Sequence, residues 1–328
     1  MSQSRVARGG VLALAMLAPM LCSFSLAQAQ EYPAKAVRIV VPNPPGGAND
    51  ILARIVADKL RERLGQSFVV DNRPGAAGNV GAEAVFRSPG DGYTLLVTTP
   101  APLVSNKSLY AKLNFDPDQF TPVSVIVSSP NVLVVRPGVA ANSVQQLINF
   151  ARANPDKLNY ATQGAGTGAH LTSELFKSAG GGLKIVHVPY KGTAPALADL
   201  FGGQVDMMFI AFGDALQHIR AGKLRALAVG SDKRNPNLPD VPTMSDTLPG
   251  FISVFWQGMV APPGTPAPVA NKLSAAVAEG IRQPDASKRL SEMSIELVGS
   301  TPQEMATFMA QESERWDKVI RAIGAKAD

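Results

Sequence analysis

The sequence predicts an α/β protein made of two lobes that two strands join. Three observations predict this fold class. Apolar, β-branched runs alternate with amphipathic helical patterns, which is typical of parallel βαβ units. The alternation forms two separate series along the chain. A long apolar run follows each series, and we interpret both runs as strands that cross between the lobes. Such an arrangement leaves a cleft between the lobes, where α/β sheets commonly bind ligands.

The first 29 residues are interpreted as a secretion signal. Arg5 and Arg8 precede an apolar stretch, and Ala27 to Ala29 supply a small-x-small cleavage pattern. A membrane anchor is the alternative, but proline and serine interrupt a stretch shorter than the roughly 20 apolar residues that a span needs. We expect cleavage after Ala29. The mature chain then has 328 − 29 = 299 residues and lacks Cys22, the only cysteine.

The first series predicts one lobe. Its expected strands are 37–42, 67–72 and 93–99, and its expected helices are 50–64 and 81–88. The run 120–138 follows as the first crossover, and Pro122, Pro130 and Pro137 are expected to break it into pieces.

The second series predicts the other lobe. Its expected helices are 143–155, 170–180, 194–203 and 214–222, and its expected strands are 158–162, 185–190, 205–210 and 224–230. The run 252–264 leads the chain back to the first lobe, where helices 266–282 and 301–323 are expected to pack. Thr301, Pro302 and Glu304 predict a capped start for the last helix. We predict lobe 1 as residues 30–128 with 253–328, and lobe 2 as residues 129–252.

Net charge excludes some function classes. The formal charge of +5 falls to +5 − 2 = +3 when the signal is removed, because the signal contains two arginines and no acids. No block of lysine and arginine occurs, so we expect no nucleic-acid partner. No second apolar run is long enough to span a membrane. A small excess of positive charge is compatible with a small anionic ligand.

Three glycine-rich loops predict a binding site. Each lies between a strand and a helix, where unpaired N–H groups and the helix dipole favour an anion. The loops contain Gly46 and Gly47; Gly75, Gly78 and Gly81; and Gly164, Gly166 and Gly168. Asn49 or Asp50 is expected to cap the helix after the first loop. A single Gly-Gly is more often a plain turn, but two lobes that each present such a loop can hold a carboxylate without arginine.

Enzyme signatures are weak in this sequence. The dinucleotide fingerprint G-x-G-x-x-G fails at the first loop, which has Ala48 and Ile51 where glycines are needed, and the sequence has no phosphate-binding loop. The three histidines lack the spacing of a zinc site. We therefore predict no catalytic residue, no cofactor and no metal. A secreted enzyme stays an alternative, with Asp50 and Lys191 as its only candidate bases.

Segments along nearly the whole mature chain resemble one known family, the Bug-type extracytoplasmic receptors of tripartite tricarboxylate transport systems. The opening "YPAKAVRIVVPNPPGGANDILAR" resembles the start of the family's sequences, and "DNRPGAAGNVGAEAV", "SPGDGYTLLV" and "FDPDQFTPVSVIV" follow in the family's order. The second lobe continues the likeness with "KLNYATQGAGTGAHLTSELF", "HVPYKGTAPALADLFGGQVDMMF" and "HIRAGKLRALAV".

This resemblance implies a type II periplasmic binding protein, or Venus flytrap, with two crossing hinge strands. It implies a periplasmic receptor that closes on a small organic acid and delivers it to the membrane permease of a tripartite tricarboxylate transporter. We expect a monomer, which is the default for a receptor that must dock on a permease. A sensory receptor for the same ligand class is the alternative. The expected ligand-binding residues are Pro45, Gly46, Gly47, Asn49, Asp50, Thr98, Thr99, Pro100, Gln163, Gly164, Gly166, Thr167, His170 and Asp206. Asp206 lies beside an expected strand of the second lobe.

The sequence departs from the family pattern at positions that bear on ligand choice. Asn43 stands where an aromatic residue is usual, and Ile210 and Ala211 replace an Asp-Asn pair that often follows "MF". A less polar wall on the second lobe predicts a longer aliphatic or aromatic acid. Trp256 is expected either to pack at the hinge or to line the cleft.

Overall fold

The computed structural model describes residues 32–164, 166–292 and 295–327. The predicted secretion signal and its cleavage position lie outside these residues. The fold described below is that of the compact unit that begins at Pro33. Among its described helices, none has the length and apolar character needed to cross a membrane.

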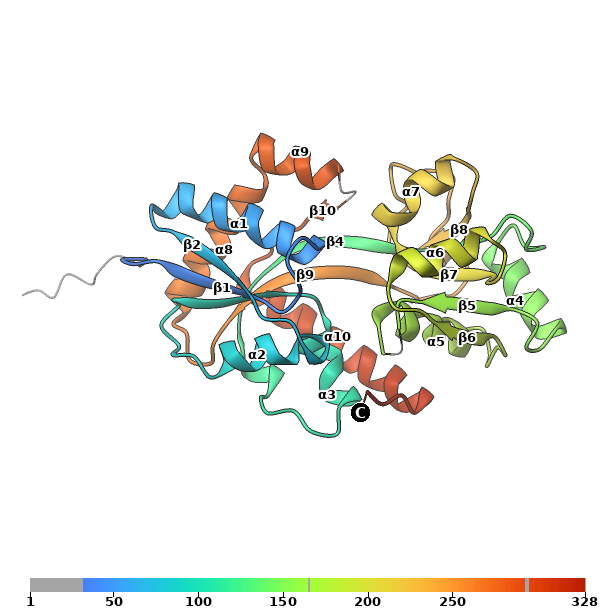
Figure 1. Cartoon of the computed structure of the whole chain (residues 1–328), viewed down its shortest axis with the longest axis horizontal. Coiled ribbons are helices and arrows are strands. Elements are labelled where there is room, and N and C mark those ends of the chain that lie inside the picture. The colour runs from blue at the N-terminus through green and yellow to red at the C-terminus, as the bar shows by residue number, and fades with distance from the viewer. Residues whose placement is uncertain (1–31, 165, 293–294, 328) are drawn as a thin grey trace, which may run out of the picture. The chain divides into compact units, whose positions relative to one another are not determined.

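The first half of the fold is built on a mixed sheet (Figure 1). Strands β2 (Phe68–Asn72), β1 (Val37–Val41) and β3 (Thr94–Thr98) are parallel and adjacent in that order. Antiparallel strands extend this sheet: β9 (Val254–Ala261) pairs with β3, β4 (Thr121–Val135) pairs with β9, and β10 (Glu296–Leu297) pairs with β4. Parallel neighbours require crossover helices, as the alternating sequence pattern predicts.

The second half is built on the other end of β4. There, β7 (Met207–Ala211) and β8 (Arg225–Val229) pair with β4 in antiparallel orientation. Strands β5 (Asn159–Thr162) and β6 (Val186–Pro189) extend the sheet from β7 in parallel. Strand β4 therefore belongs to both halves.

The two halves are defined here by strand pairing. Strand β4 pairs with β9 as far as Pro130 and with β7 from Asn131 onward, and β9 begins at Val254. We call residues 33–130 with 254–327 the first half and residues 131–253 the second half. Two crossing strands are thus present as predicted. The lobe boundaries that we predict at 128/129 and 252/253 stay a prediction.

The expectation that Pro122 and Pro130 break the first crossover is wrong, because both lie inside one continuous strand, β4. The strand ends at Val135, before Pro137, as expected of that proline. The register shifts next to Pro122, and β4 changes partner directly after Pro130. A missing N–H is tolerated at such irregular positions, because the regular ladder is already interrupted there.

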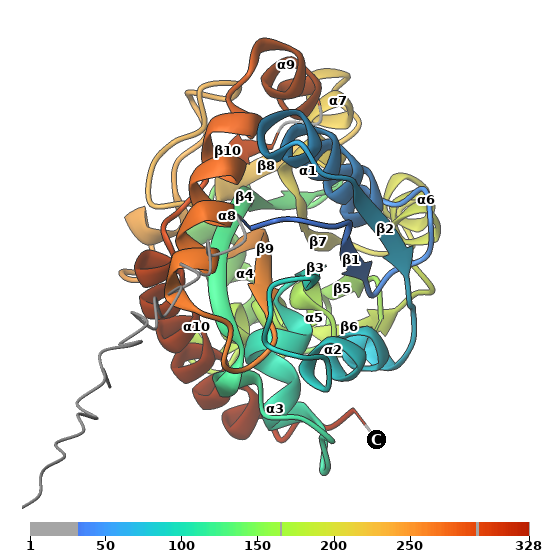
Figure 2. The ribbon, with the colours of Figure 1, turned by 90° about the vertical axis from the view of Figure 1, so that its left-hand side faces the viewer.

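Helices cover both faces of each half (Figures 1 and 2). In the first half, α1 (Ala48–Leu64), α8 (Ala267–Ile281) and α9 (Pro284–Glu292) lie on one face, and α2 (Asn79–Phe86), α3 (Asn106–Leu109) and α10 (Pro302–Ile323) lie on the other. In the second half, α6 (Thr193–Phe201) and α7 (Phe212–Arg220) lie opposite α4 (Val144–Ala153) and α5 (Gly168–Ala179). The predicted cap of α10 is confirmed, since Thr301 and Glu304 form a reciprocal capping box.

The core of the second half shows the period of two that a strand imposes. On β4, Leu133 packs with the α4 and α5 side, whereas Val132 and Val134 pack with the α6 and α7 side. In the first half, Trp256 is fully buried among residues of α2 and α10, and its Nε1 donates to Glu312 Oε2 at 3.3 Å. Trp256 therefore belongs to the core and does not line the cleft.

Candidate ligand-binding cleft

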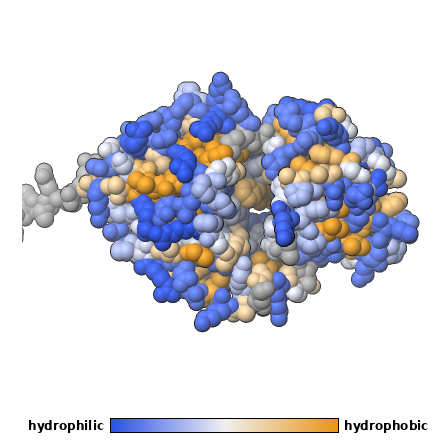
Figure 3. Space-filling model, viewed as in Figure 1, coloured by the Kyte–Doolittle hydropathy of each residue, from blue (hydrophilic) through white to orange (hydrophobic). Residues whose placement is uncertain are grey.

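A cleft of about 680 Å³ lies between the two halves. Figure 3 shows the hollow between them. From the first half it is lined by Asn43, Ala48, Ala77, Thr99, Pro100, Ala101, Ser105, Asn106, Leu109, Tyr110, Glu292, Ile295, Trp316 and Ala327. From the crossing segments it is lined by Val127, Ser128, Ser129, Asn131, Val254, Phe255 and Gln257, and from the second half by Gln163, Gly166, Thr167, Gly168, Ala169, Leu171, Thr172, Thr193, Ala211, Gly213 and Asp214.

Four helices begin at the wall of this cleft. Ala48 is the first residue of α1, Gly168 of α5 and Thr193 of α6, and α7 begins beside Ala211 and Gly213. The first N–H groups of a helix have no partner within the helix, and the helix dipole places partial positive charge there. Several sources of positive potential therefore face one cavity.

Among these four helix starts, that of α5 has the most clearly available N–H groups. Thr167 caps the helix by accepting a hydrogen bond from the N–H of His170, and its own carbonyl accepts from the N–H of Leu171. The described residues offer no acceptor to the N–H groups of Gly168 and Ala169, and both residues line the cleft. Two adjacent amides are thus available to an anion.

Charged side chains are few in this wall. Within the described chain, Asp214 and Glu292 are the charged residues that line the cleft, and no lysine or arginine does so. The described residues also contain no cluster of three or more histidine, cysteine or acidic side chains that is suited to a metal ion. An anion bound here is therefore held by backbone amides and neutral polar side chains.

Asn49 orients two side chains of the cleft wall, those of Asn43 and Gln257. Its Nδ2 donates to Asn43 Oδ1 at 2.8 Å and to the carbonyl of Val97 at 3.2 Å, and its Oδ1 accepts from Gln257 Nε2 at 3.0 Å. Asn43 and Gln257 line the cleft, but Asn49 itself is buried behind them. Asn49 is thus a positioning residue in this structure.

Asp50 holds in place the loop of residues 42–47 between β1 and α1, which we call the opening loop. Its Oδ2 accepts from the N–H of Gly46 at 2.9 Å and from Arg54 Nε at 3.0 Å, and its Oδ1 accepts from Asn72 Nδ2 at 3.0 Å. Hydrogen bonds from Arg54, Gly46 and Asn72 hold the pKa of Asp50 at about 2, against the opposing effect of burial. The expected capping role differs in detail, because Gly47 is the N-cap residue and no side chain caps α1.

Two histidines support the cleft loop of the second half. The N–H of Gly166 donates to His170 Nδ1 at 3.1 Å, which requires that nitrogen to be unprotonated. His187 Nε2 lies 2.7 Å from Thr162 Oγ1, and that hydroxyl accepts from the N–H of Gly164 at 3.2 Å. The loop that presents Gln163, Gly166 and Thr167 to the cleft is therefore fixed from behind by side chains.

The two histidine rings stack on one another and on Tyr160. Ring centroids lie 4.2 Å apart for His170 and His187, and 4.9 Å apart for His187 and Tyr160. Burial lowers the pKa of both histidines, that of His187 to about 4, and the adjacent His170 adds to the effect on His187. Glu174 accepts hydrogen bonds from Tyr160 and Lys177 beside this stack. Neutral rings are therefore favoured, and the hydrogen bond from Gly166 requires an unprotonated Nδ1 on His170.

A third network joins the crossing segments to the second half. Asn131 Nδ2 donates to Ser253 Oγ at 2.8 Å, and Ser253 Oγ lies 2.7 Å from Thr172 Oγ1. Asn131 and Thr172 both line the cleft. The place where the two crossing segments enter the second half is therefore also part of the wall.

The structure brings five of the fourteen expected site residues into the wall: Thr99, Pro100, Gln163, Gly166 and Thr167. Pro45, Gly46 and Gly47 are exposed in the loop that joins Asn43 to Ala48, two residues that do line the cleft.

Five further expected residues lie behind the wall. Asn49, Asp50, Gly164 and His170 hold the two cleft loops by the hydrogen bonds described above. Thr98 is fully buried at the end of β3, and within the described chain its hydroxyl has no hydrogen-bond partner.

Asp206 is placed away from the cleft and does not line it. It precedes β7, whereas the cleft lies at the other end of that strand, next to Ala211. Its Oδ1 accepts from Arg136 Nε at 3.0 Å and from Nη2 at 2.8 Å, and its Oδ2 accepts from the N–H of Asn159 at 3.0 Å. These bonds fix the distal end of the sheet, so we leave Asp206 out of the candidate site.

Sequence reasoning missed several wall residues. Tyr110 and Trp316 come from segments that no glycine-rich motif marks, and Asn131 and Gln257 lie on the crossing segments. The position of Asn131 and Gln257 near the predicted lobe boundaries is a signal that identifies them in retrospect. Ile210 is fully buried in the core of the second half, so it does not form the less polar wall that we expected.

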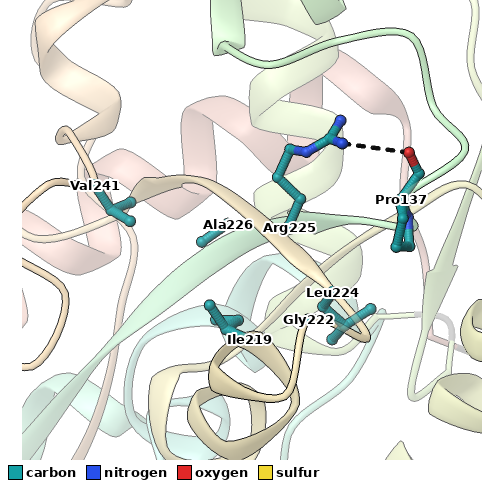
Figure 4. A pocket seen from close by; sticks show the side chains of 7 residues that line it. All are labelled: Pro137, Ile219, Gly222, Leu224, Arg225, Ala226 and Val241. Carbon is teal, nitrogen blue, oxygen red and sulfur yellow. Dashed lines mark hydrogen bonds between the residues drawn. The ribbon is translucent and has the colours of Figure 1, made fainter.

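A second pocket, of about 310 Å³, lies in the second half and is mainly apolar (Figure 4). Arg225 is the charged residue in its lining, and its guanidinium donates to the carbonyls of Pro137, Val139 and Ala141 at 3.4, 3.3 and 3.2 Å. Because these bonds already occupy the guanidinium, the pocket is a poor candidate for binding an acid.

Fold and cleft together define a two-lobed solute-binding protein. The sequence model of the family described as tripartite tricarboxylate transporter family receptor matches residues 52–325 of this chain. Protein BugT of Bordetella pertussis is 37% identical over 301 residues, which are 91% of this chain and 92% of that protein. The chain belongs to this receptor family, whose Bug-type members it resembles in sequence.

Solved structures agree with this assignment. The structure of Rpa4515 from R. palustris with adipate is 38% identical in sequence to this chain, with a TM-score of 0.76. The match covers 90% of this chain and 100% of that chain. The structure of MatC (Rpa3494) from Rhodopseudomonas palustris with bound malate is 32% identical in sequence to this chain, with a TM-score of 0.73. The match covers 88% of this chain and 100% of that chain.

Replacing Asp50 with asparagine is expected to destabilise the protein by about 2 kcal/mol at pH 7. Both oxygens of the buried Asp50 carboxylate accept hydrogen bonds, from Gly46 and Arg54 on one and Asn72 on the other, and an amide has only one acceptor oxygen and no charge. The pKa of Asp50 is about 2 in the fold and near 3.8 when unfolded, so its charge stabilises the fold above about pH 4 to 5. This contribution, about 2 kcal/mol, is lost as the pH falls toward 2.

Urea unfolding of wild type and D50N at pH 7, 4 and 3 measures this effect. The difference in unfolding free energy should shrink as the pH falls. Asp58→Asn, on the exposed side of the same helix, is the control and should change stability by less than about 0.5 kcal/mol. A D50N variant as stable as wild type at pH 7 would contradict the anchoring role.

Acid is expected to destabilise the protein through His187. Its pKa is about 4 in the fold and near 6.5 when unfolded, so only the unfolded chain takes up a proton between these values. Stability is therefore complete above about pH 7 and falls as the pH drops from 6.5 toward 4. Between pH 7 and 5.5 the wild type should lose about 1 kcal/mol more than His187→Gln in urea unfolding. Identical pH profiles for the two proteins would refute this role.

Proposed function

We propose that the protein binds a small organic acid in the cleft between its halves and delivers it to the membrane permease of a tripartite tricarboxylate transporter. In this proposal the mature chain begins at Gln30, acts in the periplasm as a monomer, and requires no cofactor or metal.

The positive potential of the helix starts at the cleft is the observation that most directly supports an acid as the ligand. Four helix starts face the cleft, and the N–H groups of Gly168 and Ala169 have no acceptor among the described residues. An anion at this position makes charge-assisted hydrogen bonds that are not available to a neutral solute. The adipate and malate in the related structures are organic acids of the proposed class.

The division of the wall between the halves supports a closing mechanism. Each half supplies polar groups to the same cleft, for example Thr99 and Asn43 on one side and Gln163 and Gly168 on the other. A ligand that contacts both sides stabilises the closed arrangement more than an open one, so binding shifts the population toward closure. The two crossing segments are the natural hinge, because β4 and β9 run between the halves.

The alternative of a secreted enzyme is weakened by the surroundings of its two candidate bases. Asp50 is buried and engaged by three donors. Lys191 is exposed and does not line the cleft. Neither side chain is placed to act on a molecule bound between the halves.

Isothermal titration of the chain from Gln30 onward tests the proposed ligand class. The probes are mono-, di- and tricarboxylates, amino acids, and neutral amides and sugars of similar size. Saturable heat with one group of acids, and none with the neutral analogues, is the expected result. Binding of a neutral sugar or a nucleotide, with none of any acid, would overturn the proposal.

Replacing Gly168 with proline is expected to weaken acid binding by at least tenfold, because proline removes one of the two available amides. Gly168 is the first residue of α5, where proline is tolerated, and Thr167 before it already has an extended backbone, with φ −70° and ψ 161°. Calorimetry with the acid identified above is the measurement.

Gly168→Ala is the matched control for this variant. A Cβ at Gly168 meets no heavy atom within 4 Å, so alanine retains the amide without a steric conflict. The alanine variant should bind within about threefold of wild type. Equal affinity of the proline and alanine variants would show that this amide does not hold the acid.

A further inference from the structure

Asp214 is an acidic side chain on the wall of a cleft proposed to bind acids. It lies in the first turn of α7 and lines the cleft beside Ala211 and Gly213. The described residues provide it with no hydrogen bond and no ion pair. The inference below rests on the proposed function, because it concerns which acid the same cleft selects.

The four helix starts around the cleft are not equivalent. Helices α5 and α6 have no acidic residue in their first turn, whereas α1 has Asp50 and α7 has Asp214. Asp50 is buried and its charge is matched by Arg54 and two further donors. Asp214 is exposed toward the cleft, and among the described residues it has no hydrogen-bond donor or ion-pair partner. The cleft therefore has a positive region at α5 and α6 and a negative one at α7.

The surroundings of Asp214 provide little to offset its charge. His218, one turn later on α7, lowers the pKa of Asp214, and this effect is smaller than that of burial, which raises it. Glu292, at the end of α9, is the other acid of the described wall, and α7 and α9 lie on the same side of the fold in Figures 1 and 2. No lysine or arginine of the described chain lines the cleft to offset these two acids.

A second carboxylate placed against Asp214 would be repelled, and a purely aliphatic end would leave the charge desolvated without a partner. A protonated amine meets neither cost, because it donates hydrogen bonds to the carboxylate and neutralises it. We propose that Asp214 makes this receptor select organic acids that carry a positively charged amino group remote from the bound carboxylate.

The rest of the wall suits such a molecule. Leu109, Val254, Phe255 and Trp316 provide apolar surface to the same cleft, and Gln163 and Thr167 provide neutral polar groups next to the start of α5. A carboxylate at α5, a methylene chain across the apolar surface and an ammonium group at Asp214 satisfy all three regions of the wall.

Matched sets of acids test the proposal. For chains of four, five and six carbons, the unsubstituted acid, the ω-amino acid and the α,ω-dicarboxylate are titrated into the chain from Gln30 onward at pH 7. The proteins are the wild type, Asp214→Asn and Asp240→Asn. Asp240 is an exposed acid of the second half that does not line the cleft, so its variant controls for the loss of one negative charge.

The wild type is expected to bind the ω-amino acid of one chain length at least tenfold more tightly than the matching unsubstituted acid and dicarboxylate. D214N should lose at least tenfold in affinity for that ω-amino acid and bind the dicarboxylate more tightly than wild type does. D240N should behave as wild type, and a melting temperature of D214N near that of wild type shows that the fold is kept.

Two results would overturn the inference while leaving the proposed function intact. One is tighter binding of the dicarboxylate than of the ω-amino acid by wild type at every chain length. The other is an unchanged preference in D214N. Failure of all acids to bind, together with the amino acids and other carboxylates of the earlier titration, would refute the proposed function and this inference with it.

Discussion

Backbone amides at helix starts, without an acceptor among the described residues, are the groups on which the proposed site depends. In the described residues of the cleft no cationic side chain is present, so the attraction for an acid comes from fixed N–H groups such as those of Gly168 and Ala169. Such groups bind well only when the loops that contain them are rigid, because every degree of freedom that a ligand must freeze weakens binding. Anchored loops are therefore a requirement of this design.

Each half meets this requirement with a different network. In the first half, Asp50 and Asn49 hold the opening loop by charge-assisted and amide hydrogen bonds. In the second half, His170 Nδ1 accepts from the N–H of Gly166, and His187 bonds to Thr162, whose hydroxyl accepts from the N–H of Gly164. The second network depends on an unprotonated Nδ1 of His170, so its strength depends on pH, whereas the first depends on a carboxylate that stays charged over a wide range.

Much of the fold was predictable from the sequence because its helices and strands have clear periods. The capping box at Thr301 and the three glycine-rich loops between strands and helices are local signals, and the structure has each of them. Pro122 and Pro130 led to the wrong prediction that the first crossover is broken at these residues. A strand that exchanges partners at Pro130 does not need the N–H of that residue. Helix α9 and strand β10 were missed, since neither stands out by period in the sequence.

The candidate site was predictable in position but not in detail. Gln163, Gly166 and Thr167 line the cleft, and their contact with a ligand stays a prediction, while His170, three residues further on, lies behind the same loop. Which side of a loop a side chain takes depends on its tertiary partners, and sequence spacing does not show them. Asp214 has the pattern of an ordinary residue in the first turn of a helix, and only the tertiary structure places it on the cleft.

A crystal structure of the mature chain with a bound acid tests the central claim most directly. The expected result is a carboxylate within hydrogen-bond distance, about 2.7–3.1 Å, of the N–H groups of Gly168 and Ala169, with contacts to both halves. An acid bound through lysine or arginine side chains elsewhere on the surface, with the amides of α5 left unoccupied, would contradict the account.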